Sequence, residues 1–253
     1  MLEDAVEYDL IARNPARGRR RKLPTPTPTR AFLEPEHVSS MLAAAGELDD
    51  QDRDGRKIRR PLLATLAFAG LRIGELLGLR WRDVDLAAGR LHVRISKTAA
   101  GVRYVDVQPE LRAELVGWKL CENPEPGDLV FGTRKGKSDS RNNVRRRVLL
   151  RAIERANENV AVANERNLGQ SEDLLIPERV SPHALRRSFA SLLVADGEDP
   201  AYVMAQLGHT DPKMTLGLYA QALTTKGRRA NRASSTEAPH RTEQLASGAA
   251  IEQ

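Results

Sequence analysis

The sequence predicts a mostly helical α+β fold with one small antiparallel sheet, and two observations support this. Apolar and amphipathic segments of helical length, bounded by Pro, Gly and Asn, account for most of the chain. Two shorter segments, "LHVRISK" and "VRYVDV", instead alternate apolar with polar residues on either side of "TAAG", the pattern of a two-stranded hairpin. In that hairpin Leu91, Val93 and Ile95 fall on one face. Val105 and Val107 are expected to pair with them.

The N-terminal region is expected to be separate from the rest. Residues 1–16 are predicted to form a short helix that ends at "RNP", because the residue before a proline is disfavoured in the helical region. "LPTPTPTR" (23–30) alternates Pro with Thr and is predicted to be an extended, stiff linker. The end of the chain is polar, poor in large apolar residues, and expected to be flexible. The predicted parts are therefore residues 1–30, a main domain over 31–222, and a tail over 223–253.

Helices are predicted on both sides of the hairpin. The first, over residues 33–46, opens with Pro and Glu and is expected to end at Gly46. The strongly apolar segment "PLLATLAFAGLRIGELLGLRW" (61–81) is interrupted near Gly70. The remaining helices are predicted over residues 109–121, 140–160, 182–196 and 200–207, with a polar loop over 164–180.

The distribution of charge favours a polyanionic partner. Lys and Arg number 40 against 34 Asp and Glu, a net charge of +6, with a pI of about 9.7. They gather in "RGRRRK" (17–22) and in "RKGKSDSRNNVRRRVLLRAIER" (134–155), where arginines recur every four residues. A solvated helix face is the plain alternative, but two such blocks favour the phosphate backbone of nucleic acid. The candidate DNA contacts are Arg19, Arg20, Arg21, Arg141, Arg145, Arg147, Arg151 and Arg155, with Arg147, Arg151 and Arg155 expected along one helix face.

Several classes of protein are disfavoured. No run of about 18 apolar residues is present to span a membrane, and the N-terminus lacks the pattern of a secretory signal. The single cysteine, Cys121, excludes an internal disulfide and a cysteine-cluster metal site, which favours the reducing cytoplasm. The sequence has no carboxylate cluster for Mg²⁺, no P-loop and no zinc ligand set, so no metal or cofactor is expected.

Two apolar helical stretches carry charged residues three positions apart. "GLRIGELLGLRW" contains Arg72 and Glu75, and an arginine among apolar residues is costly unless it is paired or faces a ligand. A structural Arg72–Glu75 pair is the alternative. "SPHALRRSFA" contains His183 and Arg186 on one helix face. A helix cap or a satisfied core histidine is the alternative for His183.

Two further stretches add groups that can transfer protons or attack phosphorus. "ISKTAAG" places Lys97 at the end of a strand beside a turn, where lysines are usually solvated. "LGHTDPKMTLGLYA" contains His209 and Tyr219, and a tyrosine on an amphipathic segment is usually core packing. The other tyrosines, Tyr8, Tyr104 and Tyr202, have ordinary packing explanations.

Together these residue types permit metal-free transfer of a phosphodiester through tyrosine. Guanidinium forks match the geometry of phosphate oxygens, and phosphoryl transfer depends mainly on positioning and charge neutralisation. A tyrosine phenol can attack phosphorus to form a covalent intermediate, and nearby cations favour the phenolate. A lysine can protonate the departing 5′ oxygen.

In their order along the chain, these motifs closely resemble the catalytic domain of the tyrosine recombinases, the phage integrase family, over roughly residues 31–222. The resemblance implies that Arg72 and Arg186 clamp the phosphate and that Lys97 is the general acid of the hairpin. It implies that Tyr219, on a late helix or loop, is the nucleophile. The resemblance also implies that His183 and His209 assist the reaction and that Glu75 supports the site without reacting. The sequence departs from many members by having Arg187 after the second arginine and one extra residue between His209 and Tyr219.

The resemblance implies a site-specific recombinase or integrase that cuts and rejoins DNA through a 3′-phosphotyrosine intermediate. Its partners would be double-stranded DNA at specific sites and other protomers of the same chain, which would form a tetramer in the synapse. It would act in the cytoplasm at the nucleoid. Residues 1–30 would be the last helix of a core-binding domain plus a basic linker, so that most of that domain is missing. The alternatives are a truncated, non-catalytic DNA-binding remnant and a type IB topoisomerase, although His183 favours a recombinase because such topoisomerases usually have lysine there.

Overall fold

The computed structural model describes residues 2–17, 32–53, 55–96, 101–166, 174–177 and 180–209. They belong to two compact units, one ending at Arg30 and the other beginning at Ala31. The first unit contains α1 (Leu2–Glu7), which is shorter than the helix expected over residues 1–16. Asp9 has a left-handed backbone (φ 56°), which breaks the helix well before "RNP".

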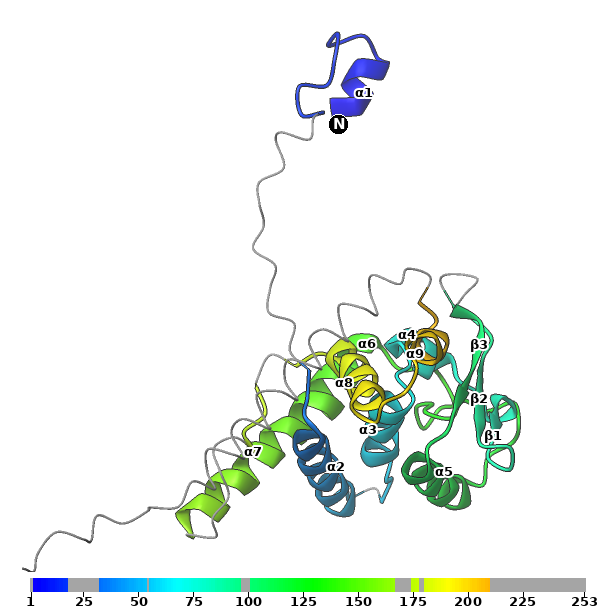
Figure 1. Cartoon of the computed structure of the whole chain (residues 1–253), viewed down its shortest axis with the longest axis vertical. Helices are drawn as coiled ribbons and strands as arrows, with labels where there is room; N and C mark the ends of the chain where they lie inside the picture. Colours follow the sequence, from blue (N-terminus) through cyan, green and yellow to red (C-terminus); the bar gives the residue numbers. More distant parts are fainter. Residues whose placement is uncertain are drawn as a thin grey trace, which may run out of the picture. The chain divides into compact units, whose positions relative to one another are not determined.

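The helical part of the second unit is built around α2 (Pro35–Asp50) and α3 (Arg59–Phe68), which pack against each other. The long α7 (Leu150–Glu165) packs along α2, and α8 (Pro182–Ala195) packs on α3 (Figure 1). The expected end of the first helix at Gly46 is wrong. Gly46 keeps a negative φ, and α2 continues to Asp50, whose neighbour Asp49 accepts hydrogen bonds from the first backbone N–H groups of α3.

The expected interruption near Gly70 is confirmed. Gly70 has a left-handed backbone (φ +56°) between α3 and the short α4 (Ile73–Gly78). A Cβ at this position would lie 2.3 Å from Cδ1 of Phe189 on α8, so only glycine lets the two segments approach this closely. The turn directs the chain from α3 into α4, which begins beside Arg72.

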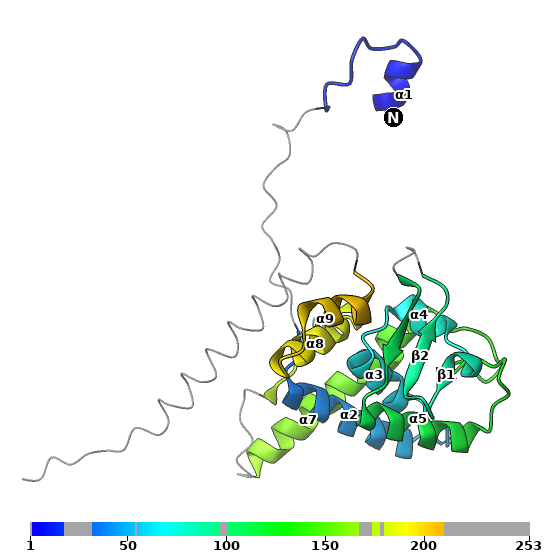
Figure 2. The same cartoon turned by 45° about the vertical axis from the view of Figure 1, so that its right-hand side comes forward.

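The sheet contains a strand that the sequence pattern did not reveal. Its antiparallel order is β1 (Val84–Asp85), β2 (Arg90–Val93) and β3 (Arg103–Asp106), after a 3₁₀ turn at Trp81–Asp83. Leu91 pairs with Val105 as expected, and both are buried. The placement of Ile95 with them is wrong, because β2 ends at Val93 and Ile95 is 85% exposed. α5 (Pro109–Glu122) lies at one end of the sheet in Figures 1 and 2.

The remaining helices follow α5 in the sequence. α6 (Arg141–Asn143) runs through a π-helical segment (Val144–Leu149) into α7, so the basic helix expected over residues 140–160 is confirmed with a change of winding. α8 and α9 (Pro200–Leu207) match their predicted ranges and share a small apolar cluster. α9 also packs against β3. None of the described helices is both long and apolar enough to span a bilayer.

Candidate phosphate-binding site at the end of α9

Helix α9 ends where charged side chains from several elements gather. Gly208 caps it with a left-handed backbone (φ 60°, ψ 47°), which glycine adopts without strain, and His209 follows. The last carbonyls of a helix lack partners within the helix, and the negative end of its dipole favours cations. Three consecutive carbonyls here accept hydrogen bonds from three arginines of different elements. The pairs are Arg103 Nε to Gln206 O at 2.6 Å, Arg186 Nη2 to Leu207 O, and Arg72 Nη2 to Gly208 O at 3.5 Å.

Arg72 occupies the N-cap of α4 rather than a position within the helix. Its backbone is extended (φ −67°, ψ 145°), and its backbone N–H donates to Glu75 Oε2 at 3.0 Å. Its Nη1 also lies 2.7 Å from Glu75 Oε1, so the structural ion pair considered from the sequence is formed. The side chain nevertheless remains 34% exposed and reaches the end of α9. The ion pair therefore orients the guanidinium and leaves part of it accessible to a ligand.

Glu75 is the carboxylate that holds these parts together. Its side chain is only 4% exposed, and it accepts from Ser96 Oγ at 3.0 Å and from Arg103 Nη2 at 3.2 Å in addition to Arg72. Burial alone would raise the pKa of Glu75, but the Arg72 hydrogen bonds and the charge of Arg103 hold it below its ordinary value. Glu75 is therefore ionised and binds α4 to both sides of the hairpin, at Ser96 after β2 and at Arg103 in β3.

Arg186 is the most deeply placed of the three arginines. It lies in the first turns of α8, is 2% exposed, and donates through Nη1 to Gly70 O and through Nη2 to Leu207 O. Burial, with the charges of Arg72 and Arg103, lowers the pKa of Arg186 to about 9, which leaves it protonated at neutral pH. The guanidinium is thus fixed by backbone carbonyls at the Gly70 turn and at the end of α9.

His209 follows Gly208 at the end of α9, and its pKa is affected by groups predicted from the sequence. Burial lowers its pKa to about 4, with further lowering by the charges of Arg186, Arg72, His183 and Arg103. His183, on the same helix as Arg186, is exposed. His209 is therefore neutral at physiological pH, and it lies within electrostatic reach of the two predicted arginines and of His183.

Other predicted site residues lie outside the described part of the chain. Lys97, Tyr219, Arg19, Arg20 and Arg21 belong to this group. The described chain stops immediately before Lys97, at Ser96, and resumes at Gly101.

The other three tyrosines have different surroundings from one another. Tyr8 is 75% exposed, so the packing expected for it is wrong. Tyr104, 61% exposed, stacks on His92 with ring centroids 4.4 Å apart. Tyr202 donates its hydroxyl to Asp106, and burial together with that carboxylate raises the pKa of Tyr202 to about 12. This opposes the phenolate that nucleophilic attack requires.

Three polar residues of the site escaped the sequence analysis. Arg103 had a recognisable signal, because it alternates with Val105 on the buried face of β3, where a charged residue is unusual. Ser96 and Gln206 carried none, since their roles depend on tertiary contacts: Gln206 exchanges hydrogen bonds with Asp106 on β3.

The basic segment before α7 adjoins this cluster. A Cβ at Gly74 of α4 would lie 2.9 Å from Arg141 Nη2, which places the start of α6 against the residues after Arg72. The side chains of Arg141, Arg145 and Arg147 are exposed. A cavity of about 410 Å³ in this segment is lined by Asn142, Asn143, Arg146, Arg147 and Arg151. Arg146, which the sequence analysis did not select, therefore belongs with the candidate DNA contacts.

Of the three arginines expected along one helix face, Arg155 is engaged by carboxylates of the protein. Arg147 lies in the π-helical segment, whose wider turns change the direction of side chains relative to α7. Arg151 lines the same cavity but lies 2.6 Å from Glu154. Arg155 is turned towards α2, with its guanidinium 3.2 Å from Glu158 and 4.0 Å from Glu47. It is a structural contact between α7 and α2.

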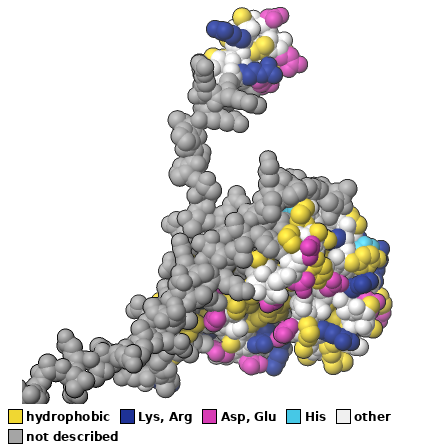
Figure 3. All heavy atoms as spheres, in the orientation of Figure 1, with side chains coloured by type: hydrophobic (Ala, Val, Ile, Leu, Met, Phe, Trp, Pro, Cys, Tyr) yellow, Lys and Arg dark blue, Asp and Glu magenta, His cyan; other side chains and the backbone are white. Residues whose placement is uncertain are grey.

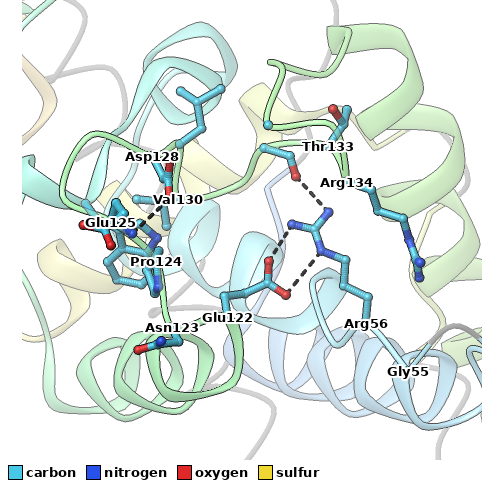
Figure 4. Close-up of a pocket in the computed structure, with 14 residues that line it drawn as sticks. Gly55, Arg56, Glu122, Asn123, Pro124, Glu125, Asp128, Val130, Thr133 and Arg134 are labelled. Carbon is cyan, nitrogen blue, oxygen red and sulfur yellow. Dashed lines mark hydrogen bonds and ion pairs between the residues drawn. The ribbon is translucent and has the colours of Figure 1, made fainter.

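A polar cavity of about 580 Å³ elsewhere in this unit shares no residue with the arginine cluster (Figure 4). Arg56 donates to Glu122 at 2.9 Å and to Gly132 O at 2.8 Å. The charges of Arg56 and Glu122 therefore neutralise each other within the protein. On the face in Figure 3, acidic and basic side chains are interspersed. Within the described ranges, no three His, Cys, Asp or Glu side chains gather as a metal site.

The sequence matches one family model and several proteins that are named as recombinases or integrases. The model of the phage integrase family matches residues 31–226. Tyrosine recombinase XerC of Pseudomonas fluorescens (strain Pf0-1) is 34% identical over 188 residues, 72% of this chain and 53% of that protein. Prophage integrase IntR of Escherichia coli (strain K12) is 28% identical over 167 residues, 60% of this chain and 40% of that protein. The chain thus spans about half the length of these curated relatives.

Solved structures show the same fold. A lambda integrase dimer bound to a COC′ core site matches with a TM-score of 0.62 at 17% identity, covering 86% of this chain and 55% of that one. The Tn1549 transposon integrase in complex with circular intermediate DNA matches with a TM-score of 0.59 at 20% identity, covering 89% of this chain and 76% of that one. The predicted fold class, mostly helical with a small antiparallel sheet, is confirmed.

Proposed function

The chain belongs to the phage integrase family, and from that membership we propose that it is a site-specific DNA recombinase. It cuts and rejoins DNA through a covalent 3′-phosphotyrosine intermediate. The observation that carries this proposal is the concentration of positive charge at the end of α9. Arg72, Arg103 and Arg186 meet there, and Glu75 is the one carboxylate among the described residues that contacts them.

A phosphodiester is the anion that this arrangement suits. Three guanidiniums against one carboxylate leave an excess of positive charge, and guanidinium forks donate in pairs to phosphate oxygens. Arg186 is preorganised by two backbone carbonyls, and Arg72 by Glu75, so neither must reorganise as charge develops on the phosphate. In this proposal Arg72 and Arg186 bind the non-bridging oxygens of the scissile phosphate.

The proposed reaction exchanges one phosphoester bond for another. The oxygen of Tyr219 bonds to phosphorus while the bond from phosphorus to O5′ breaks, leaving the 3′ phosphate on the tyrosine. Lys97 gives its proton to the departing O5′, and a histidine accepts the phenolic proton. His209, held neutral, can accept a proton or a hydrogen bond at physiological pH, and His183 lies within its electrostatic reach. The roles of Tyr219 and Lys97 rest on the motif resemblance.

The basic segment that begins at α6 is proposed to bind the flanking duplex. Arg141, Arg145 and Arg147 are exposed there, and Arg146 lines the neighbouring cavity. Phosphate contacts of this kind position the protein on DNA. We also propose that several protomers assemble on two DNA sites, as a tetramer in the synapse, in the cytoplasm at the nucleoid. The DNA partner is supported by the solved integrase structures bound to DNA. The assembly and the location rest on the family resemblance alone.

The test is covalent trapping on nicked DNA. The probe is a pool of nicked duplexes with a randomised central region, so that a preferred site can be captured and sequenced. The full chain should form protein–DNA adducts that survive denaturation, enriched in one sequence. Tyr219→Phe, which removes only the hydroxyl, should bind the same duplexes in a gel shift and form no adduct.

Each of the other outcomes would indicate a different activity or a different nucleophile. Duplex binding by the unsubstituted chain without adducts would indicate a DNA-binding protein that lacks strand transfer. Adducts spread over unrelated sequences, with relaxation of supercoiled plasmid, would indicate topoisomerase-like activity. Adducts formed by Tyr219→Phe would show that another residue is the nucleophile.

A further inference from the structure

The hairpin and the end of α9 are both fastened to α4 through one buried arginine, Arg103. Its side chain is 6% exposed, and it donates to acceptors on three segments. Nε reaches Gln206 O of α9 at 2.6 Å, Nη1 reaches Gly101 O in the hairpin at 2.8 Å, and Nη2 reaches Glu75 Oε2 of α4 at 3.2 Å. Burial lowers the pKa of Arg103, and the charge of Glu75 opposes this effect.

Glu75 accepts hydrogen bonds from both sides of the hairpin, one side on each carboxylate oxygen. Ser96, at the end of the segment that follows β2, donates to Oε1, and Arg103, at the start of β3, donates to Oε2. The turn that contains Lys97 lies between these two residues in the sequence. Glu75 Oε1 also binds Arg72. The base of the hairpin is therefore fixed to the same carboxylate that aims Arg72.

β3 holds α9 at a second point, Asp106, three residues after Arg103. Gln206 Nε2 donates to Asp106 Oδ2 at 3.0 Å, and Asp106 N donates to Gln206 Oε1 at 2.9 Å. Tyr202 donates to the same Asp106 oxygen. Asp106 is the last residue of β3 and is half-buried, whereas Arg103 reaches the last turn of α9, just before Gly208 and His209.

We infer that Arg103 is a positioning residue, which holds the base of the Lys97 hairpin and the His209 end of α9 at fixed distances from Arg72. This deepens the proposed strand transfer and rests on it. A lysine cannot replace Arg103 here, because its single ammonium cannot span acceptors on three segments, whereas the planar guanidinium donates in several fixed directions. Arg103 itself makes its contacts with protein groups and acts through its neighbours.

Arg103→Lys is the test variant. Removing the side chain altogether, as in Arg103→Ala, would leave Glu75 buried with one partner fewer and would destabilise the fold. Lysine keeps the positive charge beside Glu75, and Arg103→Gln serves as a second variant that removes the charge but keeps a donor. Arg112→Lys, on the exposed face of α5, is the matched control. Thermal unfolding confirms that each variant is folded before the other measurements.

Two readouts separate positioning from a general loss of structure. Trapping on the nicked duplexes, with enzyme in excess, should slow by about 10- to 100-fold in Arg103→Lys, since misplacement by about 1 Å has effects of this size. The affinity for the duplex should change by less than about threefold, because the arginines proposed to contact phosphate are retained. The ring resonances of His209 should shift, and amide hydrogen exchange at residues 206–209 should accelerate. Arg112→Lys should match the unsubstituted chain in every measurement.

The inference is overturned if Arg103→Lys cleaves within twofold of the unsubstituted chain. It is also overturned if the rate falls while His209 and the exchange at the end of α9 stay unchanged. If the unsubstituted chain forms no adduct, the proposed function fails. The NMR and exchange readouts then still decide whether Arg103 holds the end of α9.

Discussion

At the residue scale, the candidate site depends on where each guanidinium finds its acceptors. Arg72 is aimed by Glu75, and Arg186 is fixed by the carbonyls of Gly70 and Leu207. The sequence identified both arginines, because arginine in an apolar helical segment requires a partner or a ligand. It could not identify the carbonyl acceptors, since every residue has one and only the tertiary fold decides which carbonyls lack a partner.

Replacing Arg186 by lysine should separate binding from chemistry. Lysine keeps the charge but lacks the planar fork, so it cannot hold two carbonyls and a phosphate oxygen together. The rate of covalent trapping should fall by about 10² to 10³-fold, the usual effect of losing a preorganised charge-stabilising donor. Single-turnover trapping with enzyme in excess measures this, and gel shifts on the same duplex should show little change in affinity. A rate equal to that of the unsubstituted chain would exclude Arg186 from the phosphate site.

The protonation of His209 can be measured without DNA. Its pKa is lowered from 6.5 to about 4, so NMR titration should show its ring titrating near pH 4. The signal that Arg186→Lys shifts and His209→Gln removes is assigned to His209. Because the folded state disfavours the protonated ring, its contribution to stability is full above about pH 6.5 and is lost as the pH falls towards 4. A midpoint near 6.5 would place His209 in open solvent, away from the arginines.

At the element scale, the sequence located most helices but misplaced the ends of α1 and α2. The patterns predicted α5, α8 and α9 closely, because Pro at the helix start and a long amphipathic run determine them. They missed β1, which is only two residues long and exists through its pairing with β2. They also missed the π-helical winding at Val144–Leu149, because hydrophobic spacing over so short a segment does not distinguish it from an α-helix.

The Gly70 turn couples the packing of α8 to the placement of Arg186. Gly70→Ala should lower the free energy of unfolding by about 2 kcal/mol or more, because the new Cβ overlaps the Phe189 ring and the backbone is left-handed. Urea unfolding measures the change. Gly78→Ala is the control, since a Cβ at Gly78 meets no atom within 4 Å. Equal stability of the two variants would mean that the close approach of Gly70 to α8 is not required.

At the scale of the whole molecule, the site is assembled from segments far apart in the sequence. The fold brings together, at the end of α9, Arg72 from the start of α4, Arg103 from β3 and Arg186 from α8. The order of the motifs predicted that Arg72 and Arg186 converge, and both guanidiniums reach the end of α9, which His209 follows. Arg103 entered only through the structure, because its role is to join elements whose contacts the sequence does not specify. The placement of Lys97 and Tyr219 stays a prediction.

The proposed strand transfer is tested most directly by identifying the residue that becomes bonded to DNA. The adducts trapped on nicked duplexes would be digested with nuclease and trypsin and analysed by mass spectrometry. Cleavage after Lys213 and Lys226 gives a peptide, MTLGLYAQALTTK, that contains Tyr219 and no other tyrosine. We expect a nucleotide 3′-phosphate on Tyr219 in this peptide, and a strongly reduced yield of it from Arg186→Lys under the same conditions. A nucleotide on any other peptide, or DNA bound tightly with no modified peptide at all, would contradict it.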